Sequence, residues 1–152
     1  RATLLVAAAI AWACAGDSAE RPAPGRRALL AADAPAPVGP YSQAIAAGGT
    51  LYAAGQIGID PATGELVPGG IEAETRQALA NLRAVLAAAE LDLGDVVQAQ
   101  VFLTDMSQFA AMNRVYAEHF TGAPPARATV GVAALPKGAC FEILATAVRG
   151  GR

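Results

Sequence analysis

The sequence has few of the residues on which several common kinds of site depend. Its 152 residues include only two cysteines and one histidine, too few for a disulfide framework or for a metal site built from His and Cys ligands. Charged residues make up 16% of the chain, and the formal net charge is −2. The basic surface that drives binding to nucleic-acid phosphates is therefore missing, and we expect no nucleic-acid partner.

Generic catalytic motifs are also absent, because the chain contains no GxSxG, HExxH, GxGxxG or phosphate-binding loop. Hydrophobic residues make up 54% of the chain, and the mean hydropathy is +0.37. Such a composition excludes intrinsic disorder, and the length is that of one ordinary domain. Since aromatic residues contribute only 5%, we expect a core built mainly of small side chains.

The first residues resemble a targeting segment. Residues 4–13 (LLVAAAIAWA) are ten apolar residues without a charge, whereas a membrane-spanning helix needs about 20. The small-x-small spacing of Ala11 and Ala13 is typical of a signal-peptidase site. We expect residues 1–14 to direct export, to the periplasm, and Cys14 to be a candidate for a lipid anchor. The alternative is a leader without a targeting role and a cytoplasmic protein.

Residues 15–25 (AGDSAERPAPG) form an Ala/Pro/Gly-rich linker without apolar periodicity. The folded domain is then expected at residues 26–152. Apolar patterning and turn residues predict strands at 26–32, 42–47, 51–56, 96–104, 127–134 and 140–149, with helices over 71–89 and from 105 to 120. Gly48-Gly49 predicts a hairpin turn, and residues 60–64 (DPATG) predict a second turn.

The predicted buried faces follow from spacing. The first helix has a stripe of apolar residues and Thr75 at steps of three and four. In strand 96–104 we expect Val97, Ala99, Val101 and Leu103 to share one face. The stripe of the second helix comprises Phe109, Met112, Tyr116 and Phe120.

The predicted order β-β-β-α-β-α-β-β indicates an α+β domain with both helices on one face of a mixed sheet. Several strands are apolar on both sides, so the other sheet face must also be covered. A second copy of the chain is the simplest cover.

Two charged residues interrupt the apolar strands near the C-terminus. Arg127 is either a solvent-exposed strand end or an anion clamp, since its planar guanidinium can bind a carboxylate with two parallel hydrogen bonds. Glu142 is either an exposed edge residue or a carboxyl group of raised pKa that serves as a general base or acid. Together they pair an anion clamp with a proton-transfer group.

Other candidates carry weaker signals. Tyr41 is a pocket residue or a lid on the core, and Gly55 permits either close approach by a ligand or a bulge. Asn113 could bind a loop or a ligand. His119 is interpreted as a surface residue and Cys140 as an inert one.

Several motifs resemble the RidA (YjgF) family over nearly the whole domain. They are residues 36–44 (APVGPYSQA), 55–57 (GQI), 60–64 (DPATG), 77–82 (QALANL), 115–116 with 120 (VY and F), 125–130 (PARATV), 135–139 (LPKGA) and 141–143 (FEI). The motifs are ordered and well spaced from about residue 26 to 149.

The resemblance implies a chorismate-mutase-like α+β fold, a homotrimer with sites between subunits, and no cofactor. It also implies a 2-iminoacid deaminase that hydrolyses 2-iminopropanoate and 2-iminobutanoate to 2-oxoacids and ammonia. By the same resemblance Arg127 clamps the substrate carboxylate and Glu142 activates water. Tyr41, Asn113 and the backbone around Gly55 and Thr129 then line the pocket.

Two departures from the family pattern are visible. Ala54 stands where the family often has Ser, and Leu144 replaces a family carboxylate. The competing functions are a non-catalytic module that binds small carboxylates, and the ribonuclease or translation-inhibitor role of some relatives. The low net charge and single histidine disfavour the last.

Overall fold

The computed structural model describes residues 25–150. The expected leader at residues 1–14 and nearly all of the expected linker at 15–25 therefore lie outside the described residues. The elements are β1 (Arg27–Leu29), β2 (Ala44–Ala47), β3 (Thr50–Ile57), α1 (Gly70–Ala87), β4 (Val96–Leu103), α2 (Phe109–His119), β5 (Ala126–Gly131) and β6 (Phe141–Val148). Their order matches the prediction, with most ends shifted by a few residues.

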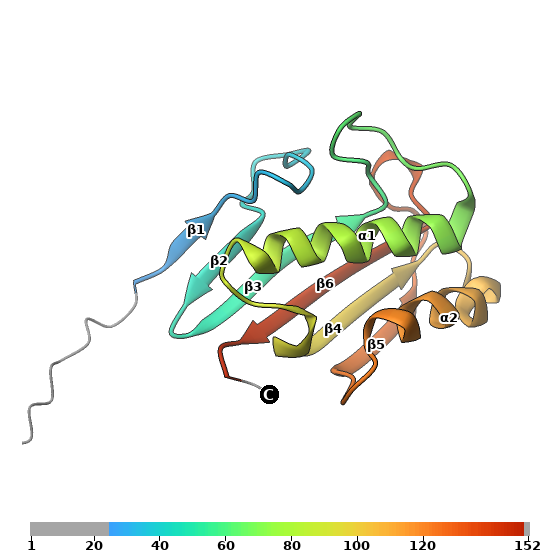
Figure 1. Cartoon of the computed structure of the whole chain (residues 1–152). Coiled ribbons are helices and arrows are strands. Elements are labelled where there is room, and N and C mark those ends of the chain that lie inside the picture. Colours follow the sequence, from blue (N-terminus) through green and yellow to red (C-terminus); the bar gives the residue numbers. More distant parts are fainter. Residues whose placement is uncertain (1–24, 151–152) are drawn as a thin grey trace, which may run out of the picture.

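The strands form one sheet in the order β1-β2-β3-β6-β4-β5 (Figure 1). All neighbouring pairs are antiparallel except β4 and β5, which run parallel and are joined through α2. A parallel pair requires such a crossover connection, because a tight turn can only reverse the chain. β4 thus lies between the two strands that carry Arg127 and Glu142.

The predicted hairpin turn is present between β2 and β3. Ala47 pairs with Thr50, and the two residues between them, Gly48 and Gly49, have φ angles of 58° and 83°. Two left-handed residues in a row suit the twist of a two-residue hairpin, and glycine adopts them without strain.

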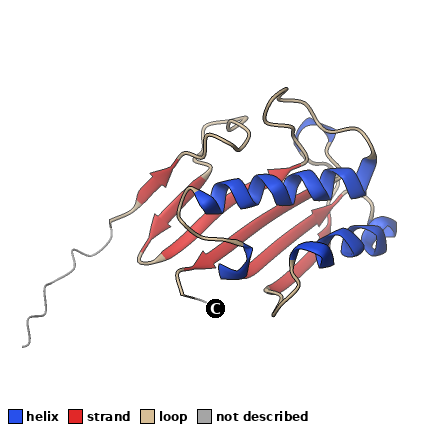
Figure 2. Cartoon of the chain, in the orientation of Figure 1, coloured by secondary structure: helices blue, strands red, loops and turns tan. Residues whose placement is uncertain are grey.

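Both helices cover the same face of the sheet, as the sequence predicted (Figure 2). The stripe of α1 is buried, and Ala78, Leu79, Leu82 and Leu86 have no exposed surface. These residues pack on alternate side chains of the central strand β6, which are likewise buried. The core is therefore one apolar layer between the helices and the sheet.

Two expectations about buried faces are wrong. Val97 is 39% exposed rather than buried, because the pairing of β4 with β6 shifts register between Val96 and Gln98. An extra residue in one strand changes which of its alternating side chains face the core on one side of the irregularity. Phe109 is 37% exposed, since it begins α2 and lies beside Arg127 instead of the core.

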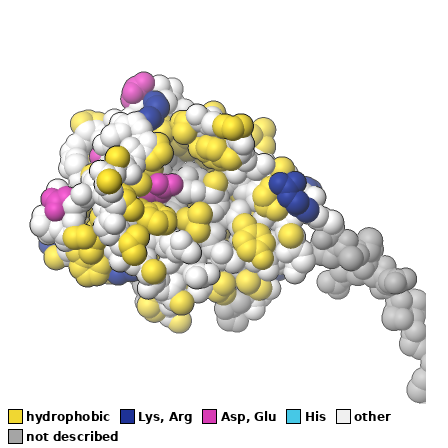
Figure 3. All heavy atoms as spheres, turned by 180° about the vertical axis from the view of Figure 1, so that it is seen from behind, with side chains coloured by type: hydrophobic (Ala, Val, Ile, Leu, Met, Phe, Trp, Pro, Cys, Tyr) yellow, Lys and Arg dark blue, Asp and Glu magenta, His cyan; other side chains and the backbone are white. Residues whose placement is uncertain are grey.

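The opposite face of the sheet has no helix over it. Tyr52 and Val130 are 54% and 45% exposed there, and Phe102 and Leu144 are half-buried on the same side. Viewed from behind, this face carries many hydrophobic and few charged side chains (Figure 3). An apolar surface of this kind marks an interaction site in soluble proteins.

Within residues 25–150, neither helix is long and apolar enough to cross a membrane.

Candidate functional site

Arg127 is held in place by α2. Its Nη2 donates a 2.7 Å hydrogen bond to the side-chain oxygen of Asn113, and its Cζ lies 4.4 Å from the centre of the Tyr116 ring. The centre of the Phe109 ring lies 5.8 Å from the same Cζ. The interpretation of Arg127 as a free strand end is therefore wrong, because three side chains of one helix orient its guanidinium.

A hollow of about 510 Å³ opens beside this guanidinium. It is lined by Arg127, Asn113, Tyr116 and the Pro124-Pro125 turn, among others. Burial raises the pKa of Tyr116 even though the nearby Arg127 charge lowers it, so the phenol stays neutral. The hollow therefore presents a fixed positive charge without a carboxylate among its lining residues, a suitable setting for an anion.

Glu142 lies on the other face of the sheet. Its neighbours Phe141 and Ile143 point under the helices and are fully buried, so the alternation of β6 directs Glu142 to the helix-free side. It faces a cavity of about 50 Å³ beneath the segment that follows β1. Burial raises the pKa of this carboxyl above its ordinary value.

Gly55 allows the carboxylate to lie directly on β3. A methyl group at Gly55 would overlap the carboxylate oxygen of Glu142, and the pairing of β3 with β6 is irregular between Ala53 and Gln56. Of the two alternatives for Gly55, the irregular pairing agrees with the bulge, and the group that approaches its backbone within this chain is the Glu142 carboxylate.

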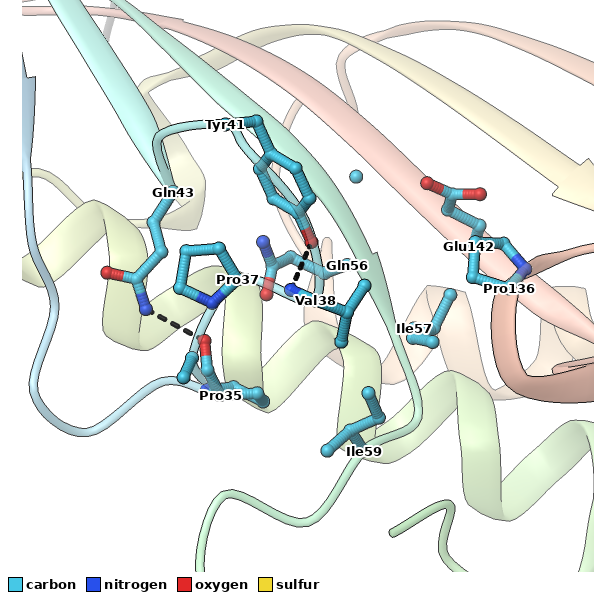
Figure 4. A pocket seen from close by; sticks show the side chains of 12 residues that line it. Pro35, Pro37, Val38, Tyr41, Gln43, Gln56, Ile57, Ile59, Pro136 and Glu142 are labelled. Carbon is cyan, nitrogen blue, oxygen red and sulfur yellow. Dashed lines mark hydrogen bonds between the residues drawn. The ribbon is translucent and has the colours of Figure 1, made fainter. Parts of the chain in front are cut away.

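Tyr41 forms another wall of the Glu142 cavity (Figure 4). It is 47% exposed, so it is not a lid on the core, and its hydroxyl accepts a 3.1 Å hydrogen bond from the Val38 N–H. Below it, Gln43 accepts from the Ala31 N–H at 2.7 Å and donates to the Pro35 carbonyl at 2.8 Å. Gln43 thereby anchors the loop that closes the cavity.

The two charged candidates do not meet within one chain. Arg127 on β5 pairs with Ala99 on β4, and Ala99 pairs with Ala145 on β6. Arg127 is therefore separated from Glu142 by two strand spacings across the sheet and by three residues along the strand direction. Strand spacing then puts their Cα atoms roughly 14 Å apart, and their side chains leave opposite faces of the sheet. The chain thus presents two separate half-sites, one with Arg127 and Asn113, the other with Glu142, Tyr41 and Gly55.

Thr129 belongs to neither cavity. It lies two residues from Arg127 on the same face, and its buried hydroxyl has no hydrogen-bond partner among the described residues. Because β5 is an edge strand, part of its backbone has no neighbouring strand to pair with. The open edge of β5 is therefore the part of this strand at which another chain or a ligand could pair with the backbone.

Cys140 is inert, as the sequence suggested. Burial and the adjacent Glu74 carboxylate raise the pKa of its thiol to about 12, so it is not a thiolate at neutral pH. Within residues 25–150, no group of three or more His, Cys, Asp and Glu side chains is arranged to hold a metal ion.

Sequence reasoning does not identify three residues that shape these two cavities. It indicates Tyr116 as a core and motif residue, and Gln43 and Asn81 only as parts of motifs. Tyr116 and Gln43 each line one cavity, whereas Asn81 lines neither and bonds two backbone carbonyls behind the Glu142 cavity. Both amides are almost fully buried, at 3% and 1% exposed. For Asn81 a signal existed, since a polar residue within the buried stripe of α1 needs a dedicated set of partners.

Comparison with known proteins agrees with this architecture. The family model described as Endoribonuclease L-PSP matches residues 31–149. The chain is 51% identical over 125 residues to the 2-iminobutanoate/2-iminopropanoate deaminase of Capra hircus, covering 82% of this chain and 91% of the goat protein. It is also 51% identical to the RutC family protein PH0854 of Pyrococcus horikoshii, over 82% of this chain and 98% of that protein.

Solved structures give the same result. RidA from the Antarctic bacterium Psychrobacter sp. PAMC 21119 has a TM-score of 0.78 at 44% identity, over 80% of this chain and 98% of that one. TdcF of E. coli, solved with bound serine, has a TM-score of 0.78 at 38% identity, over 82% and 99%. The predicted family is confirmed: the chain belongs to the RidA/YjgF family, whose model is described as Endoribonuclease L-PSP.

Proposed function

We propose that this protein is a 2-iminoacid deaminase that hydrolyses 2-iminopropanoate and 2-iminobutanoate to 2-oxoacids and ammonia. Relatives from several mammals with about half of their residues identical carry the corresponding name. The observation that carries the proposal is the Glu142 carboxylate. It is half-buried, has a raised pKa and faces a small cavity.

Arg127 binds the substrate carboxylate in this proposal. Asn113 and Tyr116 already fix its guanidinium, so little side-chain freedom is lost when the ligand binds. A bidentate pair fixes the plane of the carboxylate and therefore the direction of the adjacent C=N carbon. Such positioning is a major contribution for a reaction that is already easy in water.

Glu142 acts as the base. It removes a proton from water while the water oxygen bonds to the imine carbon and the C=N π electrons move to nitrogen, and it then passes that proton to the nitrogen. In the resulting carbinolamine, Glu142 takes the hydroxyl proton and passes it to the amine nitrogen, so that the C=O bond forms as the C–N bond breaks and ammonia leaves. A carboxyl of raised pKa suits both proton transfers near neutral pH.

Association of chains assembles the complete site in this proposal. Arg127 and Glu142 lie on opposite faces of one sheet, so a single small imino acid reaches both only if they come from different chains. The apolar helix-free face supports the homotrimer that the family resemblance implies. One Arg127 half-site then faces the Glu142 half-site of the next subunit.

The direct test is the release of 2-oxoacid from freshly generated 2-iminobutanoate by the purified protein. Glu142→Gln keeps the shape of the side chain and should lower kcat about 100-fold, while binding of a small carboxylate persists. Arg127→Lys keeps the charge but not the planar fork, so KM should rise about tenfold or more. An unchanged rate in Glu142→Gln would contradict the role of that carboxylate.

A second candidate is a module that binds small amino-acid carboxylates without turnover. The serine in the TdcF structure favours it. A binding module gains nothing from a carboxylate beside a carboxylate ligand. Retention of ligand binding together with no release of 2-oxoacid by the unsubstituted protein would make it the better description.

A further inference from the structure

The sheet-facing side of α1 carries a line of polar residues under the Glu142 cavity. Glu74, Gln77 and Asn81 follow one another at steps of three and four residues, the spacing of neighbours on one helix face. Glu74 and Asn81 are 7% and 1% exposed. Buried polar groups of this kind destabilise the fold unless each has a partner, so their partners indicate what they do.

Both polar atoms of the Asn81 side-chain amide are hydrogen-bonded. Its Nδ2 donates to the backbone carbonyls of Ile57 at 3.1 Å and Ile59 at 2.8 Å. Its Oδ1 accepts a 2.9 Å hydrogen bond from Gln77. Ile57 and Ile59 are apolar walls of the cavity that Glu142 faces (Figure 4). The amide of Asn81 therefore fixes one wall of the cavity from the helix side.

The intervening residue is also fixed. A Cβ at Gly58 would lie 2.6 Å from the Cα of Glu74, so the chain at this point rests directly on α1. The carboxylate of Glu74 in turn accepts a 2.8 Å hydrogen bond from the backbone N–H of Cys140, two residues before Glu142. One helix thus holds the Ile57–Ile59 wall and the strand that carries the carboxylate.

We propose that Asn81 is a positioning residue for substrate specificity, an inference that rests on the proposed deaminase function. By holding Ile57 and Ile59, it keeps the cavity beside Glu142 small enough to favour short aliphatic imine side chains. The cavity of about 50 Å³ has room for roughly four water-sized groups. Loss of the amide removes the side-chain partner of both carbonyls. The Ile57 carbonyl then keeps only its bond from the Ile59 N–H, and the wall moves to find other partners for the carbonyls.

A purely structural role for Asn81 predicts something different. If the amide only stabilised the contact between α1 and β3, its loss would lower activity toward every imine by the same factor. A role in shaping the wall changes the ratio between substrates, because one methylene in an apolar pocket alters discrimination by about tenfold or more. The ratio of kcat/KM values is therefore the decisive quantity.

The experiment compares 2-iminobutanoate with the bulkier imine derived from leucine. In Asn81→Leu we expect the ratio of kcat/KM, small over bulky, to fall at least about tenfold. The matched control is Val85→Ala, one turn further along the same buried stripe and outside the cavity. It should lower Tm, whereas the ratio stays within about twofold of the unsubstituted protein.

An unchanged ratio in a folded Asn81→Leu protein, or an equal change in Val85→Ala, would overturn the proposal. If Asn81→Leu does not fold, Asn81→Ser is measured against the same criterion. If the unsubstituted protein hydrolyses neither imine, the proposed function fails and this inference fails with it. Activity with an unchanged ratio overturns the inference alone.

Discussion

The guanidinium of Arg127 lies 4.4 Å from the centre of the Tyr116 ring, across the gap between β5 and α2. A cation over an aromatic face is stabilised by about 0.5–2 kcal/mol, depending on how far it is desolvated. The Tyr116 hydroxyl has no hydrogen-bond partner of standard geometry among the described residues. Burial raises the pKa of this hydroxyl, and the opposing effect of Arg127 is mainly that of its charge. The ring, rather than the hydroxyl, is the part that orients the arginine.

Tyr116→Leu should therefore raise KM for an imino acid roughly 3- to 30-fold while kcat changes little. Tyr116→Phe keeps the ring under the guanidinium, and its KM should stay within about twofold. Steady-state kinetics on both variants separates the two contributions. Equal KM values for the two variants would show that the ring contact does not orient Arg127.

The close approach of β3 to Glu142 gives a second prediction. In Gly55→Ala the added methyl occupies the position of the carboxylate oxygen, so Glu142 must turn away. We expect kcat to fall about 100-fold, as for loss of a general base, and the free energy of unfolding to decrease by about 1–3 kcal/mol.

The control for this substitution is Ala54→Ser at the preceding position. It restores the residue that the family often has and should retain most of the activity. A Gly55→Ala protein with normal kcat would show that Glu142 can work from another rotamer.

Local patterning predicted most of the fold, because it is set by contacts close in sequence. The stripe of α1 and the Gly48-Gly49 hairpin both depend on residues a few positions apart, and both are present. The register shift at Val97 could not be predicted. It arises from the pairing of β4 with β6, strands that are distant in the chain.

The geometry of the site shows the same limit. The sequence places Arg127 and Glu142 on successive predicted strands and pairs them as an anion clamp and a proton-transfer group, without giving the distance between them. The sheet inserts β4 between those strands and turns the two side chains to opposite faces. Strand order and facing are properties of the whole sheet, so no local pattern could predict that the two residues belong to separate half-sites.

The helix-free sheet face leads to a third prediction. Tyr52 is 54% exposed on this face. It pairs with Thr146 of β6, which is four residues along that strand from Glu142. Tyr52→Asp should fold, since the side chain is exposed in one chain, but it would bury an unpaired charge on association. We expect light scattering to report monomers at micromolar concentration, with loss of imine hydrolysis.

The matched control is Ala80→Asp on the exposed side of α1, which adds the same charge away from the sheet. It should leave the oligomeric state and the activity unchanged. A fully active monomer of Tyr52→Asp would contradict a site shared between subunits.

The raised pKa of Glu142 predicts how activity depends on pH. The base must be ionised, so kcat/KM should increase as pH rises through the pKa of the carboxyl. Because burial raises that pKa, the midpoint should lie above the ordinary glutamate value of about 4.3. In Glu142→Gln this acidic limb should disappear from the residual activity.

The raised pKa of Glu142 should also make the free energy of unfolding depend on pH. A carboxyl whose pKa is higher in the folded than in the unfolded protein binds its proton more tightly when folded. Its contribution to the free energy of unfolding is full below the unfolded pKa and is lost as pH rises through the folded pKa. The Tm of Glu142→Gln, relative to that of the unsubstituted protein, should therefore be higher at pH 7 than at pH 4.

The control for this measurement is Glu90→Gln. The Glu90 side chain is 87% exposed and lines neither half-site cavity. The difference in Tm between Glu90→Gln and the unsubstituted protein should vary much less between these pH values. If the two variants have the same pH dependence of Tm, Glu142 is not a carboxyl of raised pKa.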